Sequence, residues 1–303
     1  MRAAALTEFG PPEVLRVMEV ADPRAGAGEV RVRVRAAGVQ PFDCGVRNGD
    51  FPRSRTGDFP IIPGNEFAGT VDQVGEGVTG LSAGDPVLGF RTLGAYAEYV
   101  VVSAEQVVPK PESMSWEVAG AFSGSAQGAR NALLEMRVGP GETILVNGAA
   151  GGLGTMALQL ARVRGVRTVI ATAREENHDH LRRLGAVPLT YGEGLVDRIR
   201  AVAPNGVDAS LGAGLDALRA SVEVTRDPYR VVSMIWNDEV EALGVHDWTG
   251  VRTAGGLTEM VDLYDRGGLE VHHRALHPLE RAADAQRDVG SGHGRGKVVL
   301  TVD

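Results

Sequence analysis

Residues 146–162, VNGAAGGLGTMALQLAR, join an apolar run to a helix-like run through a glycine-rich turn. The four residues at 143–146, T-I-L-V, are β-branched or apolar and predict a short buried strand. After this turn, apolar residues recur at i, i+4 and i+7 (Met156, Leu160 and Val163), which predicts one apolar face of a helix. A strand, a tight glycine turn and a helix leave several helix-start N–H groups unpaired, and such groups can bind an anion.

Strand-like and helix-like segments alternate around this motif. Short strands are expected at 143–146, 168–171, 187–191, 207–211 and 230–234, with helical stretches between them. Such alternation predicts a parallel sheet covered by helices on both faces.

The residues before about Glu112 predict a separate β domain. The run VRVRVRA at 30–36 alternates apolar and basic residues, as a half-exposed strand does. The closing KVVLTV, 297–302, predicts a strand that returns to this first domain. We therefore expect an α/β chain in which residues 1–115 and 252–303 form one domain and residues 116–251 form an inserted one.

Composition narrows the class of protein. The 303 residues are 43% hydrophobic and 23% charged, as in an ordinary globular protein, and the net charge is −8. An acidic balance argues against nucleic acid as a partner. No apolar run approaches the ~18 residues of a membrane span, and the N-terminus lacks a signal-peptide pattern. Cys44 is the only cysteine, which excludes disulfides and thiolate zinc clusters. We expect a cytoplasmic protein with neither nucleic acid nor membrane as a partner.

The glycine turn has the form A-x-G-x-x-G at Ala149, Gly151 and Gly154, and it lies between a predicted strand and a predicted helix. At such positions Gly151 lets the backbone approach a pyrophosphate, and Gly154 allows close packing of helix on strand. The alternative is a glycine-rich turn that only packs. The context favours a dinucleotide site formed by Ala149, Ala150, Gly151, Gly152, Leu153 and Gly154.

The end of the second predicted strand indicates which dinucleotide is bound. The sequence at 171–174, A-T-A-R, has no acid to bind the ribose hydroxyls of NAD, whereas Arg174 suits a 2′-phosphate. Glu175 and Glu176 would repel a phosphate, but Thr172 followed by Glu175 predicts a capping box, in which acids stabilise a helix start. The alternative is that Arg174 is an ordinary surface arginine. The pattern favours NADPH.

Several ordered motifs resemble one known family. They are AGVQPFD at 37–43, PGNEFAG at 63–69, the glycine-punctuated run at 74–85, GAYAEYV at 94–100, the glycine turn, and GKVV at 296–299. Together they resemble the medium-chain dehydrogenase/reductase superfamily, and within it the zinc-free quinone oxidoreductase (ζ-crystallin-like) branch. The resemblance implies a Rossmann doubly wound parallel sheet inserted in a chaperonin-10-like β-barrel domain, with an active-site cleft between the two domains. It also implies hydride transfer from NADPH to a quinone or an activated double bond.

The same resemblance assigns roles to particular residues. It implies that the nicotinamide lies near Gln40 and near the backbone of Met234 and Ile235, after the fifth strand. Tyr191 matches a tyrosine beside the 2′-phosphate in relatives, or it only caps a strand. In zinc-dependent relatives the positions of Gln40 and Asn65 are usually cysteine and histidine, so no metal is expected here.

The chain departs from the pattern near the expected substrate. Phe51 stands where enoyl-thioester reductase relatives have a proton-donating tyrosine, so catalysis would use water or another group. Gly128 stands where relatives often have threonine. Candidate pocket residues are Phe42, Phe51, Trp236, His246 and Trp248, with core packing as the alternative for each.

Three functions are compatible with this pattern. The first is an NADPH-dependent, zinc-independent reductase of small quinones or α,β-unsaturated carbonyl compounds. The second is a trans-acting enoyl or tailoring reductase of secondary metabolism, and the third is a non-catalytic NADPH-binding protein. The family also implies a homodimer formed by edge strands of the parallel sheet, for which VEALGV at 240–245 is the candidate.

Overall fold

The structure is a computed structural model that describes residues 1–303 except 213, 236, 248, 249 and 293. The predicted pocket residues Trp236 and Trp248, and the side chain of His246, lie outside the described part. The chain divides into two compact units. Unit 1 is Met1–Gly124, Arg252–Asp265 and Val271–Asp303, and unit 2 is Ser125–Val251 and Arg266–Glu270.

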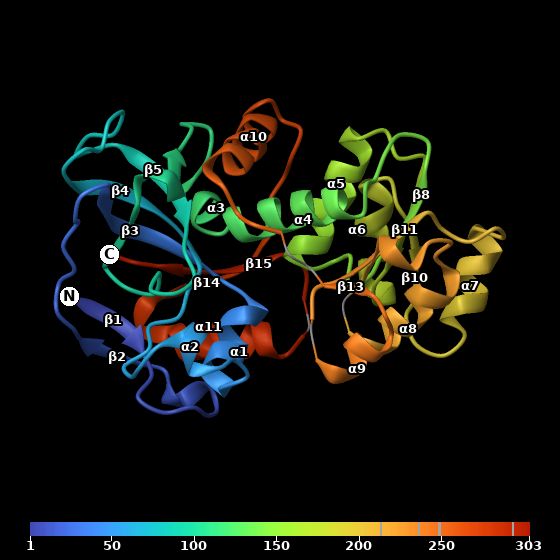
Figure 1. Cartoon of the computed structure of the whole chain (residues 1–303), viewed down its shortest axis with the longest axis horizontal. Coiled ribbons are helices and arrows are strands. Elements are labelled where there is room, and N and C mark those ends of the chain that lie inside the picture. The colour runs from blue at the N-terminus through green and yellow to red at the C-terminus, as the bar shows by residue number, and fades with distance from the viewer. Residues whose placement is uncertain (213, 236, 248–249, 293) are drawn as a thin grey trace. The chain divides into compact units, whose positions relative to one another are not determined.

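Unit 1 is mainly β (Figure 1). Its strands are β1 (Arg2–Ala5), β2 (Arg16–Glu19), β3 (Glu29–Val39), β4 (Glu66–Val74), β5 (Pro86–Phe90), β6 (Tyr99–Ser103), β7 (Val107–Pro109), β14 (His273–Pro278) and β15 (Lys297–Thr301). Its helices are α1 (Pro41–Asn48), α2 (Arg53–Thr56), α3 (Trp116–Gly120), α10 (Ala254–Asp265) and α11 (Ala282–Gly290).

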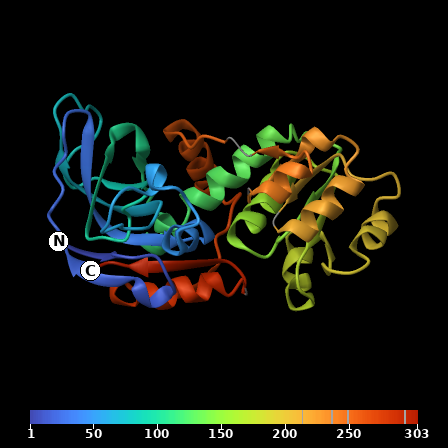
Figure 2. The same ribbon diagram turned by 60° about the horizontal axis from the view of Figure 1, so that its bottom comes forward.

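Strand β3 organises unit 1. The strand order is β14-β15-β3-β4-β5-β7, and β6 also pairs with β3. The predicted alternation is confirmed: Val30, Val32 and Val34 are buried, whereas Arg33 and Arg35 face outward. Because β15 pairs antiparallel with β3, the closing strand does return to the first domain. Helix α11 packs along β14 and β15 (Figures 1 and 2).

Unit 2 alternates strands and helices. Its strands are β8 (Thr143–Val146), β9 (Thr168–Thr172), β10 (Val187–Leu189), β11 (Ala209–Gly212), β12 (Val231–Ser233) and β13 (His246–Asp247). Its helices are α5 (Gly152–Val163), α6 (His178–Arg183), α7 (Leu195–Val202), α8 (Leu215–Val224) and α9 (Asp238–Ala242); α4 (Ser123–Glu135) precedes β8 and has all but its first two residues in this unit.

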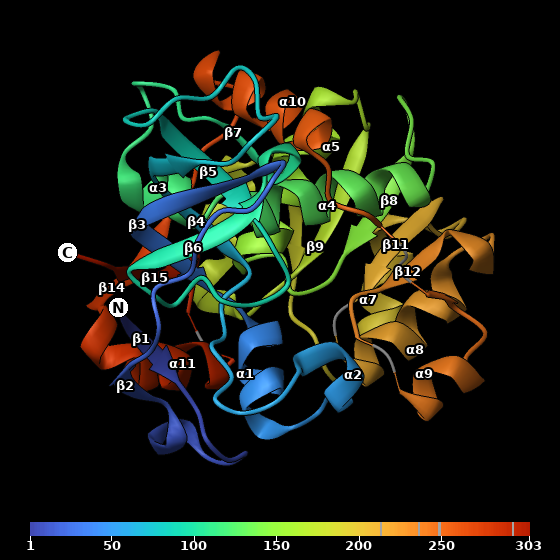
Figure 3. The same ribbon diagram turned by 60° about the vertical axis from the view of Figure 1, so that its left-hand side comes forward.

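The sheet of unit 2 has the order β10-β9-β8-β11-β12-β13, and each neighbouring pair is parallel. In chain order this is 3-2-1-4-5-6, the dinucleotide-binding doubly wound topology. All four residues of β8 are buried, because helices cover both faces of the sheet (Figures 2 and 3). The predicted fold class is confirmed: a Rossmann sheet whose sequence is inserted in that of a chaperonin-10-like β domain.

Two local predictions are wrong. Met156 and Leu160 are buried on α5 as expected, but Val163 is 52% exposed because it is the last helical residue and lies beyond the packed face. The segment 240–245 is not an edge strand. Its first residues complete α9, which Asn237 caps by accepting a hydrogen bond from the N–H of Val240, and the edge strand β13 follows.

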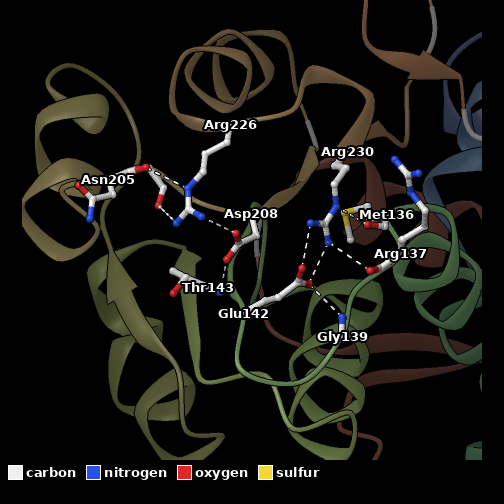
Figure 4. Close-up of polar contacts among 10 residues, drawn as sticks. Met136, Arg137, Gly139, Glu142, Thr143, Asn205, Asp208, Arg226 and Arg230 are labelled. Carbon is white, nitrogen blue, oxygen red and sulfur yellow. Dashed lines mark hydrogen bonds and ion pairs between the residues drawn. The ribbon is translucent and has the colours of Figure 1, made fainter.

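An ionic network holds the amino ends of three strands in unit 2 (Figure 4). Arg230, just before β12, donates to both carboxylate oxygens of Glu142, just before β8, at 2.9 and 2.8 Å. Arg226 donates to Asp208, whose other oxygen accepts from the N–H of Thr143. The hydrogen bond from Arg230 lowers the pKa of the Glu142 carboxyl. Ligands of this fold bind at the carboxyl ends of the strands, so this cluster is structural.

Candidate functional site

The glycine turn follows β8 at the carboxyl edge of the parallel sheet. Gly148 has φ 63°, a left-handed conformation that favours glycine. A Cβ on Gly154 would lie 2.6 Å from both the Cα of Ala149 and the carbonyl oxygen of Gly148, so only glycine fits there. A Cβ on Gly151 would meet only the Gly148 oxygen, at 3.4 Å. The protein's own packing thus requires Gly154 but not Gly151.

The backbone donors that open α5 are unused by the described part of the chain. The N–H groups of Gly152, Leu153 and Gly154 open α5 and donate no hydrogen bond to any residue that the structure describes. By contrast, the N–H of Ala149 donates to the carbonyl of Thr172 on the neighbouring strand, at 2.9 Å. Unpaired donors at the start of a twelve-residue helix attract a phosphate.

Buried polar side chains hold the glycine turn in place through hydrogen bonds. Asn147 donates to the carbonyl of Leu211 and to the hydroxyl of Ser221, and it accepts from the hydroxyl of Thr172 at 3.0 Å. These bonds join the carboxyl ends of β8, β9 and β11. The sequence analysis missed Asn147, although an amide that closes an apolar strand signals a buried hydrogen-bonding role.

The predicted capping box is wrong. Thr172 is buried and its hydroxyl contacts Asn147 and the N–H of Gly148, not Glu175. The short 3₁₀ turn Glu175–Asn177 begins after Arg174 without a side-chain cap. Glu175 and Glu176 are exposed.

Arg174 and Tyr191 lie together. Arg174 follows β9 by two residues and Tyr191 follows the neighbouring strand β10 by two, and Arg174 Nε donates to the Tyr191 hydroxyl at 3.0 Å. Tyr191 is 46% exposed, so the pair is open to a ligand. The structure therefore places a guanidinium and a phenol side by side at the carboxyl edge that carries the glycine turn.

The predicted backbone contacts after β12 are only partly available. The hydroxyl of Ser233 donates to the carbonyl of Ile235 and accepts from its N–H, so both groups of Ile235 are occupied. The N–H of Met234 donates to Gly212 at 3.2 Å. The carbonyl of Met234 accepts no hydrogen bond from the described residues and is the free group of this segment.

Unit 1 contains a buried polar cluster around Gln40. Gln40 Nε2 donates to Asn65 Oδ1 at 3.0 Å and to Glu66 Oε1 at 2.8 Å. Lys297 Nζ lies 2.7 Å from Glu66 Oε1, and the N–H of Gly124 donates to Glu66 Oε2 at 2.6 Å. Glu66 is fully buried and Lys297 is 6% exposed, so two opposite charges share this interior site.

Asp43 extends the cluster. Its carboxylate accepts from the N–H of Gln40 and from the hydroxyl of Tyr96, both at 2.9 Å. Burial raises the pKa of Asp43 from 3.8 to about 6, and burial also raises the pKa of Tyr96 well above its ordinary value. Arg252 donates to the backbone and side-chain oxygens of Asn65. The sequence analysis named Gln40 and Asn65 individually, whereas Asp43, Glu66 and Lys297 entered it within family motifs and their mutual contacts were not predicted.

These residues do not fit a zinc ion. Both protons of the Gln40 amide nitrogen are used, and Asn65 Oδ1 already accepts from Gln40 and Arg252. The ammonium of Lys297 supplies the positive charge beside Glu66. Zinc prefers thiolate, imidazole or carboxylate ligands. No group of three or more His, Cys, Asp or Glu suited to a metal occurs among the described residues.

Phe51 packs on Phe42, with ring centroids 4.8 Å apart and planes tilted by 40°. Both rings are half-buried at the edge of the unit 1 core. Gly128, the other departure, lies in α4, where a Cβ would meet Leu153 Cδ1 at 3.0 Å.

The chain was compared with known families and proteins. Residues 26–112 match the family model of the alcohol dehydrogenase GroES-like domain, and residues 184–300 match that of the zinc-binding dehydrogenases. Human quinone oxidoreductase is 34% identical over 335 residues, covering 99% of this chain and 97% of that protein. The human synaptic vesicle membrane protein VAT-1 homolog is 30% identical, covering 99% and 86%.

A solved structure agrees with these matches. The Escherichia coli quinone oxidoreductase in complex with NADPH superposes with a TM-score of 0.89 at 25% identity, over 99% of this chain and 100% of that one. No described helix is long and apolar enough to cross a membrane. On these matches and on its fold, the chain belongs to the medium-chain dehydrogenase/reductase superfamily, in the quinone oxidoreductase branch.

Proposed function

We propose that this protein is an NADPH-dependent, zinc-independent reductase that transfers hydride to a quinone or to the activated double bond of an α,β-unsaturated carbonyl compound. The observation that carries the proposal is the pair of features at one sheet edge: unpaired N–H groups at the glycine turn and Arg174 beside Tyr191. The first suits a diphosphate and the second a 2′-phosphate. Relatives named quinone oxidoreductase support the same reaction class.

In this proposal Ala149–Gly154 bind the pyrophosphate. The N–H groups of Gly152, Leu153 and Gly154 donate hydrogen bonds to it. The backbone of Ala149, Ala150 and Gly151 packs against it. The missing side chain of Gly151 is explained by the ligand, because the protein's own packing leaves room for a methyl group there. Arg174 Nη atoms and the Tyr191 hydroxyl bind the 2′-phosphate, with the guanidinium as a charge-assisted donor.

Bound NADPH supplies the hydride. The residues of this chain position the partners: the Met234 carbonyl accepts a hydrogen bond from the nicotinamide, and the side chain of Gln40, which is part of the capping box of α1, lines the site. The Gln40 nitrogen does not polarise the substrate, because Asn65 and Glu66 hold both of its protons. Phe51 has no proton to give, so the proton for the reduced product comes from water.

The test is NADPH oxidation, followed at 340 nm, with 1,4-naphthoquinone and with simple enones. Turnover of either acceptor is expected. Tight NADPH binding without turnover of any acceptor would instead indicate a non-catalytic binding protein, and turnover restricted to thioester-bound acceptors would indicate a trans-acting enoyl reductase. Metal analysis of the active enzyme is expected to find no stoichiometric zinc.

We also propose a homodimer in which the sheet edge at β13 pairs with its copy. Strand β13 is the last in the order of the sheet and pairs with β12 through only two residues. An unpaired edge presents N–H and carbonyl groups to a second chain. Light scattering should give twice the 31.9 kDa chain mass, and a monomeric mass would refute the dimer.

A further inference from the structure

The single turn α2 presents two arginines to two pairs of aromatic rings. The Arg55 guanidinium carbon lies 5.3 Å from the centre of the Phe42 ring and 5.0 Å from that of Phe51. Arg53 lies over a different pair, Phe9 at 5.0 Å and Phe59 at 3.8 Å. Helices α1 and α2 lie next to each other in Figures 1 and 3.

The two arginines differ in what their N–H groups contact. Arg53 donates to the carbonyl of Gly57 at 3.0 Å, which closes its own turn. Arg55 is exposed; its backbone N–H donates to the carbonyl of Pro52, but no hydrogen bond or ion pair joins its guanidinium to any residue in the described part of the chain. This happens in a chain with eight more acidic than basic side chains, and with Asp50 and Asp58 close in sequence.

Stacking leaves the Arg55 guanidinium held but unused. Both rings lie within cation–π distance of it, and the N–H donors at the edge of its planar group donate no hydrogen bond to the described residues. An edge of this kind binds a carboxylate through two parallel hydrogen bonds. Because the rings already fix the side chain, less conformational entropy is lost when an anion binds.

The apolar surface beside this cation is also available. Phe42 and Phe51 are half-buried, so part of each ring is open to an apolar group. Phe42 follows Gln40 by two residues at the start of α1, and Gln40 is the residue that the proposed function places in the reaction site. An anion-binding edge, an aromatic surface and the proposed reaction group therefore lie within one short stretch of unit 1.

We propose that Arg55 is a specificity-determining residue that binds the acidic group of the acceptor, whose ring packs against Phe42 and Phe51. The preferred substrates are then aromatic or quinonoid acceptors with a carboxylate side chain. The inference rests on the proposed function and names its substrate class. It gives α2 a role in choosing substrates and gives Arg53 only a structural one.

The experiment uses two ligands that differ only in charge: a 1,4-naphthoquinone with a propanoate side chain, and its methyl ester. Calorimetry on the whole protein at low ionic strength should show the acid binding at least fivefold more tightly than the ester. In Arg55→Gln this preference should disappear, and Arg55→Lys should retain part of it. The matched control Arg53→Gln, a stacked arginine on the same turn, should keep the full preference. The KM values for NADPH-driven turnover should follow the same order.

Equal binding of acid and ester by the unaltered protein, or a preference that survives in Arg55→Gln, would overturn the inference. So would failure of both ligands to bind. Failure of the proposed function has a different signature: no acceptor is turned over, while the Arg55-dependent preference in binding is still measured by calorimetry. Circular dichroism of each variant checks that a lost preference does not come from unfolding.

Discussion

Replacing Lys297 with methionine tests the buried charge pair of unit 1. The fully buried carboxylate of Glu66 receives three hydrogen bonds, from Lys297, Gln40 and the backbone of Gly124, and only Lys297 carries charge. Lys297→Met keeps an apolar chain of similar length and removes that charge. The carboxylate is then left in the interior with two neutral donors.

The expected loss follows from these contacts. Removing one partner of a buried ion pair costs about 3–5 kcal/mol, because the remaining charge is uncompensated. The two neutral donors still stabilise the Glu66 carboxylate, so we expect a loss of unfolding free energy at the lower end of this range, about 3 kcal/mol. Lys110 is the only other lysine and a matched control: its ammonium contacts the carbonyls of Pro111 and Met114 but no carboxylate. Lys110→Met should cost about 1 kcal/mol.

Urea unfolding followed by far-ultraviolet circular dichroism measures both variants. The double variant Glu66→Gln with Lys297→Met should cost less than the sum of the single changes, by roughly 2 kcal/mol or more, because it removes both charges. A Lys297→Met protein that unfolds within 1 kcal/mol of the unaltered one, or alongside Lys110→Met, would refute the reasoning.

Three further predictions concern the turn, the buried acid and a strained residue. Gly151→Ala should leave the thermal midpoint of the cofactor-free protein unchanged and should weaken NADPH binding about tenfold or more. Gly154→Ala should lower the thermal midpoint as well. An NADPH affinity in Gly151→Ala equal to that of the unaltered protein would contradict the assignment. The folded pKa of Asp43, about 6 against an ordinary 3.8, means that its contribution favours folding below pH 4 and is lost as the pH rises through 6. The stability difference between the unaltered protein and Asp43→Asn should therefore fall by on the order of 3 kcal/mol between pH 4 and 7 in urea unfolding, and a flat difference would count against it. Arg137 has φ 53°, so Arg137→Gly should raise the unfolding free energy by roughly 1 kcal/mol while Arg137→Ala should not; a gain in both would show that strain is not the cause.

Local patterns in the sequence were enough to predict the architecture. The T-I-L-V strand is β8 with the predicted bounds, and the order of strands and helices along unit 2 matches the expectation, because apolar period and glycine turns are local properties. The capping-box prediction failed because a distant residue took the hydroxyl of Thr172. Thr172 bonds to Asn147, 25 positions earlier, in place of capping the turn that follows it.

The candidate sites also differ in how far apart in the sequence their residues lie, and this decided which of them could be predicted. The glycine turn could be found from spacing, because its residues are consecutive. The Glu66–Lys297 pair joins residues 231 positions apart, and no spacing rule connects them. The direction of the Gln40 amide was equally hidden, since it depends on which oxygens face it in the folded chain. Burial sets the raised pKa of Asp43, and burial is known only once the core is assembled.

Calorimetric titration with NADPH and NADH, on the unaltered protein and on Arg174→Gln, tests the central claim most directly. A charge-assisted bond to the 2′-phosphate is worth about 1.5–3 kcal/mol, or roughly ten- to a hundredfold in Kd. We expect NADPH to bind more tightly than NADH by this factor, and we expect Arg174→Gln to remove the difference without weakening NADH. Arg182→Gln, at an exposed arginine paired with Asp179, is the control and should change neither affinity. Equal binding of the two cofactors, an Arg174→Gln variant that keeps the preference, or no binding of either cofactor would contradict the account.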